Sequence, residues 1–307
     1  LNKELTIYDT AIIGAGCAGL GAAMYCGRFD MKTLVLGEVV GGTIITTDIV
    51  ENYPGFISLT GIELAEKLKQ HSLSYPSVKI KEERVTNISK KNSCFELKTE
   101  DAIYHSKTVI FSTGTEIRKL NVPGEKEFAN KGVHYCALCD GAFYKDKVIA
   151  VVGGSDSAGK EALLLTQYAK KVYIIYRGEN IRPEPINYKR IMENKKIEII
   201  PLTNVLKING DKTVNSVVLD SAYNGSNDLK LNGVFIEIGH IPLTQLAKEI
   251  GVSLNEKDEI IIDRESKTNI SGVFAAGDCV DTRFKQAITG VGEAVSASYS
   301  AYQYLKG

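Results

Sequence analysis

The residues best suited to chemistry in this chain are two cysteines three positions apart, Cys136 and Cys139, followed directly by Asp140. Cysteines at this spacing can close a tight disulfide, and a positive environment can lower a thiol pKa until the nucleophilic thiolate forms. A zinc ribbon also uses this spacing, but it needs a second pair of ligands. The other cysteines are scattered singly, and no pair of histidines completes such a site: Cys17, Cys26, Cys94 and Cys279. The pattern favours a redox-active dithiol and predicts no metal site.

A dinucleotide-binding unit follows the dithiol. Apolar residues 148–152 predict a strand, Gly153 opens a phosphate loop that contains Ser155 and Ala158, and residues 159–169 have a helical pattern. Strand, glycine-rich loop and helix in this order place a pyrophosphate at the N-terminus of a helix. A dithiol beside such a unit suggests that electrons pass from a cofactor to a disulfide.

A second unit of the same kind opens the chain. Residues 7–13 predict a strand and residues 20–28 a helix, with Gly14, Gly16 and Gly19 in the loop that joins them. In this fingerprint the first glycine allows a tight turn, and the second lets the backbone approach the pyrophosphate. The third glycine lets the helix pack closely on the strand.

The elements after each loop support the same interpretation. A strand is predicted at 33–36, and Glu38 follows it, about 20 residues past the loop, where an acid binds a ribose hydroxyl. Each unit also ends on an apolar strand that runs into a glycine, at 108–114 and at 233–239. The chain therefore contains one domain type twice.

The C-terminal part looks like the remainder of the first domain. Residues 260–263, residues 272–278 and a helical tail at 286–305 follow the second unit. We therefore expect an α/β protein with two Rossmann-like three-layer nucleotide-binding domains, the second inserted into the first. The two crossings, near 116–119 and 239–243, make a natural hinge.

Composition bounds the class of protein. The 307 residues are enough for about two domains, each with its own core. Lys and Arg together number 37, as do Asp and Glu, so no net charge attracts nucleic acid or an anionic membrane. Six cysteines in a chain of this length do not make a secreted disulfide scaffold. No stretch has the length of a signal peptide's apolar core or of a membrane span, so we expect a cytoplasmic protein.

Over its whole length the chain resembles the low-molecular-weight thioredoxin reductases of the bacterial and archaeal type. The resemblance depends on separated motifs in the right order: the Gly14 loop, Gly41-Gly42, Glu51-Asn52-Tyr53-Pro54-Gly55, Ser112-Thr113-Gly114, Cys136-Ala137-Leu138-Cys139-Asp140-Gly141, Phe274-Ala275-Ala276-Gly277-Asp278 and Lys285-Gln286-Ala287. It implies an FAD-binding domain of residues 1–115 and 244–307. Residues 116–243 would form the NAD(P)H-binding domain that carries the dithiol.

The resemblance also implies which residues contact the cofactors. In the FAD domain the Gly14 loop would hold the pyrophosphate, Glu38 the adenosine ribose and Asp278 the ribityl-phosphate side. The other residues expected there are Gly42, Asn52, Thr113, Gly114, Gly277, Gln286 and Ala287, with Asn52, Gln286 and Ala287 near the isoalloxazine. The residues expected at the nicotinamide nucleotide are Gly153, Ser155, Ala158, Arg177 and Arg182.

By the same resemblance, Cys139 would be the sulfur nearest the flavin and Cys136 the thiol that attacks the disulfide of thioredoxin. Asp140 would act as the general acid or base, because a carboxylate in a closed site can have its pKa raised toward neutrality. The inserted domain would rotate about the two crossings, so that its thiols can face the flavin in one position and thioredoxin in the other. The resemblance further implies a homodimer. His134 is expected to be a loop residue more often than a catalytic one.

The chain departs from the family pattern at three places. Ser155 replaces the middle glycine of the second fingerprint, Thr43 replaces the glutamine usual after Gly41-Gly42, and Gly178 replaces one arginine of the nucleotide signature. Arg177 and Arg182 remain, and two guanidinium groups suit a 2′-phosphate, which favours NADPH over NADH.

Other functions stay open. The same fold can take its electrons from a ferredoxin or a deazaflavin, or it can act as an oxygen-dependent dithiol oxidase. A flavin-bearing redox sensor is the non-enzymatic alternative, although the sequence shows no partner surface for it.

Overall fold

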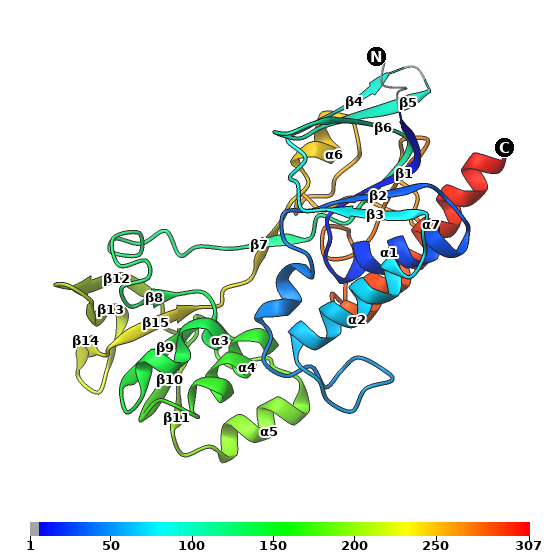
Figure 1. The fold of residues 1–307 in the computed structure, drawn as a ribbon. Coiled ribbons are helices and arrows are strands. Elements are labelled where there is room, and N and C mark those ends of the chain that lie inside the picture. The colour runs from blue at the N-terminus through cyan, green and yellow to red at the C-terminus, as the bar shows by residue number, and fades with distance from the viewer. Residues whose placement is uncertain (1–5, 92) are drawn as a thin grey trace. The chain divides into compact units, whose positions relative to one another are not determined.

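The structure is a computed structural model that describes residues 6–91 and 93–307, and it divides into two compact units (Figure 1). One unit takes in the described residues up to Glu116 together with Pro242–Gly307, and the other spans Ile117–Ile241. The segments that cross between them pair as two short strands, β7 (Thr115–Ile117) and β16 (His240–Pro242). The expected α/β class is confirmed.

The first unit is built on a sheet in the order β3-β2-β1-β6-β5-β4, with β17 added beside β6. Its strands are β1 (Ile7–Ile13), β2 (Thr33–Leu36), β3 (Val78–Lys81), β4 (Asn87–Lys91), β5 (Cys94–Lys98), β6 (Ile103–Phe111) and β17 (Val273–Ala275). The pairs that involve β1, β2, β3 and β17 are parallel, whereas β4 and β5 form an antiparallel edge. The predicted strands at 7–13 and 33–36 coincide with β1 and β2.

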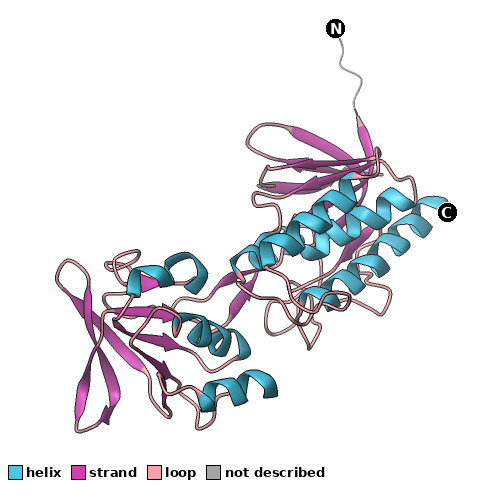
Figure 2. Cartoon of the chain, turned by 60° about the horizontal axis from the view of Figure 1, so that its bottom comes forward, coloured by secondary structure: helices cyan, strands magenta, loops and turns pink. Residues whose placement is uncertain are grey.

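Helices cover this sheet (Figure 2). They are α1 (Cys17–Arg28), η1 (Gly42–Thr46), α2 (Gly61–Leu73), α6 (Gln245–Glu249) and α7 (Ala287–Lys306). Alternate residues of β1 face two separate cores: Ala11 and Ile13 join one, and Ile12 joins the other, together with Ala22 of α1 and Ala294 of α7. This alternation is the signature of a sheet buried on both faces, with one apolar layer on each side.

The second unit has a fully parallel sheet in the order β11-β10-β9-β15-β8 and a separate antiparallel sheet, β12-β13-β14. The parallel strands are β8 (Val133–His134), β9 (Val148–Val152), β10 (Lys171–Ile175), β11 (Ile197–Ile200) and β15 (Gly233–Ile236). The antiparallel strands are β12 (Val205–Gly210), β13 (Val214–Tyr223) and β14 (Ser226–Lys230). The helices are α3 (Ala137–Asp140), η2 (Gly141–Tyr144), α4 (Asp156–Leu165) and α5 (Pro185–Glu193).

Two helices begin earlier than their patterns predicted. Helix α1 begins at Cys17 and not at residue 20, because Gly16 is the last residue with extended backbone. Helix α4 begins at Asp156, because Ser155 caps it through a bond from Ala158 N–H. Both phosphate loops are therefore shorter than expected, and each helix N-terminus lies nearer its strand.

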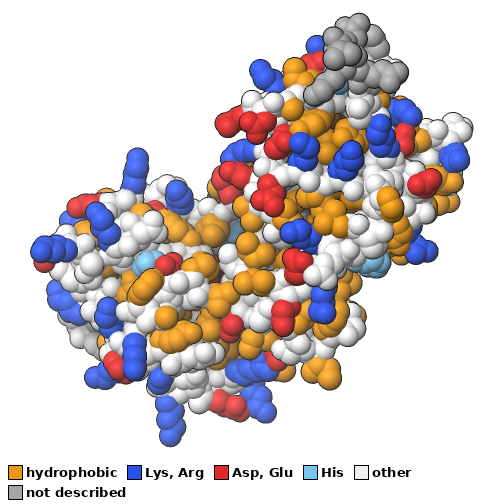
Figure 3. Space-filling model, in the orientation of Figure 1, with side chains coloured by type: hydrophobic (Ala, Val, Ile, Leu, Met, Phe, Trp, Pro, Cys, Tyr) orange, Lys and Arg blue, Asp and Glu red, His pale blue; other side chains and the backbone are white. Residues whose placement is uncertain are grey.

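The face of the molecule drawn in Figure 3 shows no dominant charge. On the face drawn in Figure 3, Lys and Arg side chains are interspersed with Asp and Glu. This mixture agrees with the formal net charge of zero. No helix in the described part of the chain is long and apolar enough to cross a membrane.

Candidate active site

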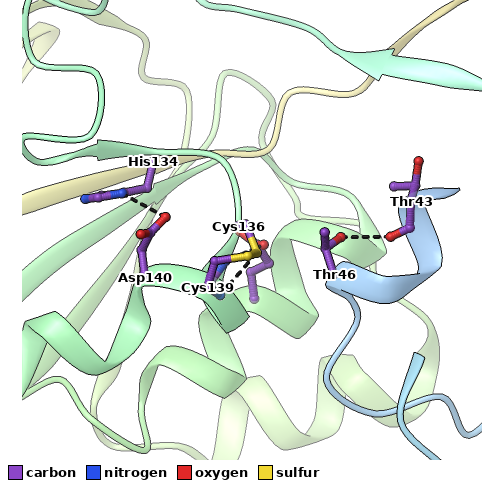
Figure 4. Close-up of a disulfide and its surroundings, with 8 residues drawn as sticks. Thr43, Thr46, His134, Cys136, Cys139 and Asp140 are labelled. Carbon is purple, nitrogen blue, oxygen red and sulfur yellow. Dashed lines mark hydrogen bonds and ion pairs between the residues drawn. A yellow bond between two sulfur atoms is a disulfide. The ribbon is translucent and has the colours of Figure 1, made fainter. Parts of the chain in front are cut away.

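Cys136 and Cys139 form a disulfide at the start of α3 (Figure 4), with their Cα atoms 5.4 Å apart. Cys136 has extended backbone and caps the short helix, because its sulfur accepts the Cys139 N–H at 3.1 Å. Cys136 is half-buried and Cys139 is exposed. The two predicted redox residues are therefore joined at the surface of their unit, where an incoming disulfide can reach them.

A glutamate anchors the first turn of this helix. The Ala137 N–H donates to Glu161 Oε1 of α4 at 2.9 Å, and Ala137 itself is fully buried. Burial raises the pKa of Glu161 to about 7. The hydrogen bond from the Ala137 N–H lowers this pKa, and the charge of the neighbouring Asp140 raises it. Glu237, 7% exposed just past β15, has its pKa raised by burial and by Glu161. Glu161 therefore raises the pKa of Glu237, whereas the hydrogen bond from Glu237 lowers that of Glu161, and the two carboxyl groups lie together behind the dithiol.

Asp140, the predicted acid or base, ends α3 and faces His134. His134 Nδ1 lies 3.0 Å from Asp140 Oδ2, as Figure 4 shows, and His134 Nε2 lies 2.7 Å from the hydroxyl of Tyr144. His134 is 5% exposed and lies on β8. The prediction that His134 is a loop residue is wrong, because the parallel pairing of β8 with β15 buries it against Phe235.

The second phosphate loop is tightly held at its first glycine. Gly153 has φ +149°, and a Cβ there would lie 2.0 Å from the Glu237 carbonyl oxygen, so no other residue fits. Ala158 packs against it and is fully buried, as a small third position of the fingerprint must be. The ring of Tyr176 lies against Gly154, where a Cβ would come within 2.5 Å of it.

The two retained arginines follow β10. Arg177 and Arg182 are both exposed, and the Arg182 N–H donates to the Gly154 carbonyl oxygen at 2.7 Å, which ties this segment to the phosphate loop. Ser155 is exposed, and its hydroxyl accepts the Ala158 N–H at 3.4 Å. The loop therefore uses one of the amides of the α4 N-terminus on its own serine.

The first phosphate loop is a close-packed cradle. Gly14 has φ +109°, and a Cβ would lie 2.1 Å from the Ser112 carbonyl oxygen; at Gly19 a Cβ would lie 1.9 Å from the Gly14 carbonyl oxygen. Gly16 differs, because a Cβ there would meet no described atom closer than 3.8 Å. No side chain caps α1 at Gly16, and its first turn carries no acidic residue. The helix N-terminus is thus prepared for an anion.

The neighbouring loop approaches the same place. Gly41 pairs with Gly16 as an isolated β-bridge. Gly42 has φ +64°, and a Cβ there would lie 2.9 Å from Gly16 Cα, which is too close for a larger residue. Glu38, the predicted ribose ligand, is exposed and pairs with Arg84 at 3.5 Å. Both Gly42 and Glu38 therefore lie on the segment that leaves β2.

The structure brings several distant predicted residues together. Asn52 Nδ2 donates to Gln286 Oε1 at 3.0 Å, and Gln286 is the residue before Ala287, where α7 begins. Gly277, with φ +86°, donates its N–H to Glu293 Oε2 at 2.8 Å. These contacts join the start of α7 to the loop after β17.

Other predicted residues line the same unit. Burial, and then the charge of Asp278, raises the pKa of Cys17 to about 12, so Cys17 stays a protonated thiol and is not a reactive thiolate. Thr113 Oγ1 donates to the Leu243 carbonyl oxygen at 2.6 Å, and Gly114 follows with φ +65°. Thr113 and Gly114 thus belong to the first crossing segment.

These features fit a bound FAD in the first unit. The open space at Gly16 and the uncapped N-terminus of α1 form a cradle, and a larger residue at Gly14 or Gly19 would clash with the backbone that shapes it. Among the residues that the structure describes, no group of three or more His, Cys, Asp or Glu side chains could hold a metal ion.

Sequence reasoning missed three residues near the dithiol, Glu161, Glu237 and Tyr144, and it missed the buried position of His134. All are brought there by packing between segments far apart in the chain. Only His134 carried a sequence signal, its place two residues before Cys136.

Comparisons with known proteins define the class. The family model for pyridine nucleotide-disulphide oxidoreductases matches residues 8–294, and the chain belongs to that family of oxidoreductases. Relatives that it resembles include several thioredoxin reductases, as the sequence resemblance implied. The chain is 41% identical to a thioredoxin reductase of Listeria innocua over 316 residues, which covers 100% of this chain and 96% of the relative.

Solved structures agree. The thioredoxin reductase of Lactococcus lactis, in its FR conformation, matches with a TM-score of 0.93 and 38% identity, over 97% of this chain and 99% of that one. A ferredoxin-flavin thioredoxin reductase from Clostridium acetobutylicum matches with a TM-score of 0.53 and 31% identity, over 99% of both chains.

Proposed function

We propose that this chain reduces the disulfide of a thioredoxin-like protein with electrons from NADPH, carried through FAD and the Cys136–Cys139 pair. The observation that carries the proposal is this disulfide, exposed at Cys139 and adjacent to Asp140, in a unit that also contains a phosphate loop. Family membership supports the same chemistry, because the family couples a pyridine nucleotide to a disulfide.

We propose that FAD binds residues 1–115 and 244–307, with its pyrophosphate at Gly14, Gly16 and Gly19. Bound there, it would accept electrons from the nicotinamide and deliver them to the disulfide. The other residues proposed to hold it are Glu38, Gly42, Asn52, Thr113, Gly114, Gly277, Asp278, Gln286 and Ala287.

Residues 116–243 are proposed to bind NADPH. Gly153, Ser155 and Ala158 would face its pyrophosphate, and the exposed Arg177 and Arg182 would face its 2′-phosphate, which a guanidinium binds through charge-assisted hydrogen bonds. The hydrogen bond from the Arg182 N–H to the Gly154 carbonyl oxygen supports this assignment, because it ties Arg182 to the phosphate loop.

In the thiol steps the Cys136 thiolate attacks one sulfur of the partner's disulfide, forming a mixed disulfide and releasing one partner thiolate. Cys139 then attacks the Cys136 sulfur, which reforms the Cys136–Cys139 disulfide and releases the second partner thiolate. Asp140 carries the proton that a released thiolate takes up. The partner gains two electrons and two protons, and the enzyme's dithiol loses them.

The proposed enzyme is a homodimer in the cytoplasm. Several large apolar side chains of the first unit are exposed, among them Ile57 at 97%, and a second copy would cover such a surface. A disulfide that must be reduced in every cycle suits a reducing compartment.

Turnover with purified thioredoxin tests the proposal. The wild-type chain, loaded with FAD, should reduce thioredoxin with NADPH. The Cys136→Ser,Cys139→Ser double variant should still have its flavin reduced by NADPH but should not reduce thioredoxin. Normal thioredoxin reduction by the double variant would overturn the proposed route.

A second candidate differs only in the electron donor. Ser155 uses the Ala158 amide, and Gly178 stands where the family has an arginine, so two contacts to a nucleotide are weakened. The likeness to a ferredoxin-flavin thioredoxin reductase points the same way. If NADPH and NADH both fail to reduce the flavin while a reduced ferredoxin succeeds, the thiol chemistry stands and the donor changes.

A further inference from the structure

Three aromatic rings pack together directly behind the dithiol helix. His134 on β8 and Phe235 on β15 are register partners in neighbouring parallel strands, and their rings stack with centroids 5.2 Å apart. Tyr144 packs edge-on against both, at 5.4 Å and 5.5 Å. A Cβ at Gly233 would lie 2.3 Å from the Tyr144 ring, so the phenol has no space to move toward the sheet. The ring of His134 is therefore held in one orientation.

That orientation directs the two ring nitrogens of His134 at two different partners. Nε2 lies 2.7 Å from the Tyr144 hydroxyl, and Nδ1 lies 3.0 Å from Asp140 Oδ2. The approach to Asp140 is too poorly aligned for a hydrogen bond in this disulfide state. Contacts of this kind often tighten only during reaction.

The partners decide which nitrogen carries the proton. Burial, and then the charge of Asp140, raises the pKa of Tyr144 to about 12, so the phenol keeps its proton and can donate it to Nε2. If the proton were on Nε2, the lone pair of Nδ1 would face the oxygens of an ionised Asp140, and the two would repel each other. The neutral ring therefore favours the tautomer with N–H on Nδ1, directed at the carboxylate.

We infer that His134 is a positioning residue for Asp140: fixed by Tyr144 and Phe235, it directs an N–H at the carboxylate and stabilises its ionised form. The inference rests on the acid–base role of Asp140 in the proposed function. It adds to that function a residue outside the Cys-x-x-Cys-Asp motif, which orients the carboxylate that exchanges the proton.

Two amide variants separate the two contacts. In His134→Asn the amide nitrogen stands near the place of Nδ1 and keeps a donor toward Asp140, whereas in His134→Gln it stands near the place of Nε2 and faces Tyr144. We expect His134→Gln to raise the midpoint of the Asp140-dependent limb of the pH profile by about one pH unit. His134→Asn should leave that midpoint near the wild-type value.

The Asp140-dependent limb is defined as the part of the profile that Asp140→Asn removes. The other titratable groups that face Asp140 are Tyr144 from η2 and Glu161 from α4, with Glu237 behind Glu161. None of them changes in the two variants. Reduction of the flavin by NADPH, measured in the same preparations, should proceed at the wild-type rate.

His71→Phe serves as the matched control, because this histidine is exposed on α2 in the other unit. It should not move the profile. Equal shifts in His134→Asn and His134→Gln, or no shift in either, would overturn the inference.

Nitrogen NMR of histidine-labelled protein gives a readout that needs neither turnover nor a stable His134 variant. The chain has only four histidines, so the His134 signal can be assigned as the one that Asp140→Asn moves most. We expect a neutral ring protonated on Nδ1, and an Nε2-protonated ring would overturn the inference. If the wild-type chain fails to reduce thioredoxin, the proposed function is wrong, whereas this spectrum still tests the His134 contact.

Discussion

Replacement of Gly16 by alanine should abolish tight FAD binding without unfolding the first unit. Gly16 has φ −75°, which alanine adopts freely, and its nearest described neighbour to a new Cβ is the Gly41 carbonyl oxygen at 3.8 Å. The loss of glycine at this helix cap should cost less than about 1 kcal/mol of unfolding free energy. The protein alone therefore accepts the methyl group.

A bound pyrophosphate would not accept it. The methyl group would occupy the side of the loop that the phosphates must approach, and it would displace hydrogen bonds to charged oxygens worth about 1.5–3 kcal/mol each. Loss of one or two such bonds, about 3 kcal/mol, corresponds to about a 100-fold rise in the Kd for FAD.

Two other glycines provide the controls. Gly19→Ala should unfold more easily by about 1–3 kcal/mol, because its Cβ would lie 1.9 Å from the Gly14 carbonyl oxygen. Gly292→Ala, on the exposed side of α7 with nothing within 4 Å, should retain FAD and gain up to about 1 kcal/mol.

Equilibrium dialysis against FAD gives the affinity, and far-ultraviolet circular dichroism of the apoproteins gives the stability, since the chain has no tryptophan to report unfolding. Wild-type affinity in Gly16→Ala would refute the assignment of this loop to FAD. An apoprotein as unstable as Gly19→Ala would refute the claim that the loop is open at Gly16.

Further predictions concern the carboxylates and the donor. Glu161 binds its proton more tightly in the folded chain, with a pKa of about 7 against an ordinary 4.5, so wild-type stability should fall as pH rises between these values. Glu161→Gln should make that slope shallower, a gain of up to about 3 kcal/mol at pH 8 in urea unfolding, because Glu237, whose pKa is also raised, keeps its own contribution. An equal slope in both proteins would contradict this prediction. Asp140→Asn should slow thioredoxin reduction at least about tenfold and leave flavin reduction intact, as stopped-flow absorbance can measure. Arg177→Ala should narrow the NADPH preference over NADH about tenfold in steady-state kcat/KM, and an unchanged ratio would place the 2′-phosphate elsewhere.

The local parts of this fold were predictable because they depend on local stereochemistry. Apolar runs of four to seven residues became β1, β2 and β9 with the expected bounds. The glycine fingerprint was equally predictable from the sequence, because only glycine fits at Gly14 and Gly19, where a Cβ would clash with the backbone. Even Ser155 could have been predicted as a helix cap, because serine is among the preferred residues at that position.

The surroundings of the dithiol were not predictable in this way. Glu161 reaches Ala137 across 24 positions, and the stack of His134 on Phe235 depends on which strand becomes the neighbour of β8. Periodicity identifies a strand but not its partner, so buried polar contacts between strands need the sheet order first. Thus His134 was assigned to a loop, although Val133 and His134 form the strand β8.

The two phosphate loops of this chain differ in a way that suits two different tasks. At Gly16 no side chain caps α1, so all the first-turn amides are available to an anion. At Ser155 the hydroxyl accepts one first-turn amide of α4, and the acidic Asp156 stands in the same turn. A carboxylate and a competing hydroxyl both weaken anion binding at a helix N-terminus, so the second loop should bind a dinucleotide less tightly than the first. In the proposed reaction FAD stays through many cycles, while the nicotinamide nucleotide must leave after each one. The loop with the free amides therefore suits the proposed resident cofactor, and the self-capped loop suits the proposed exchanging one.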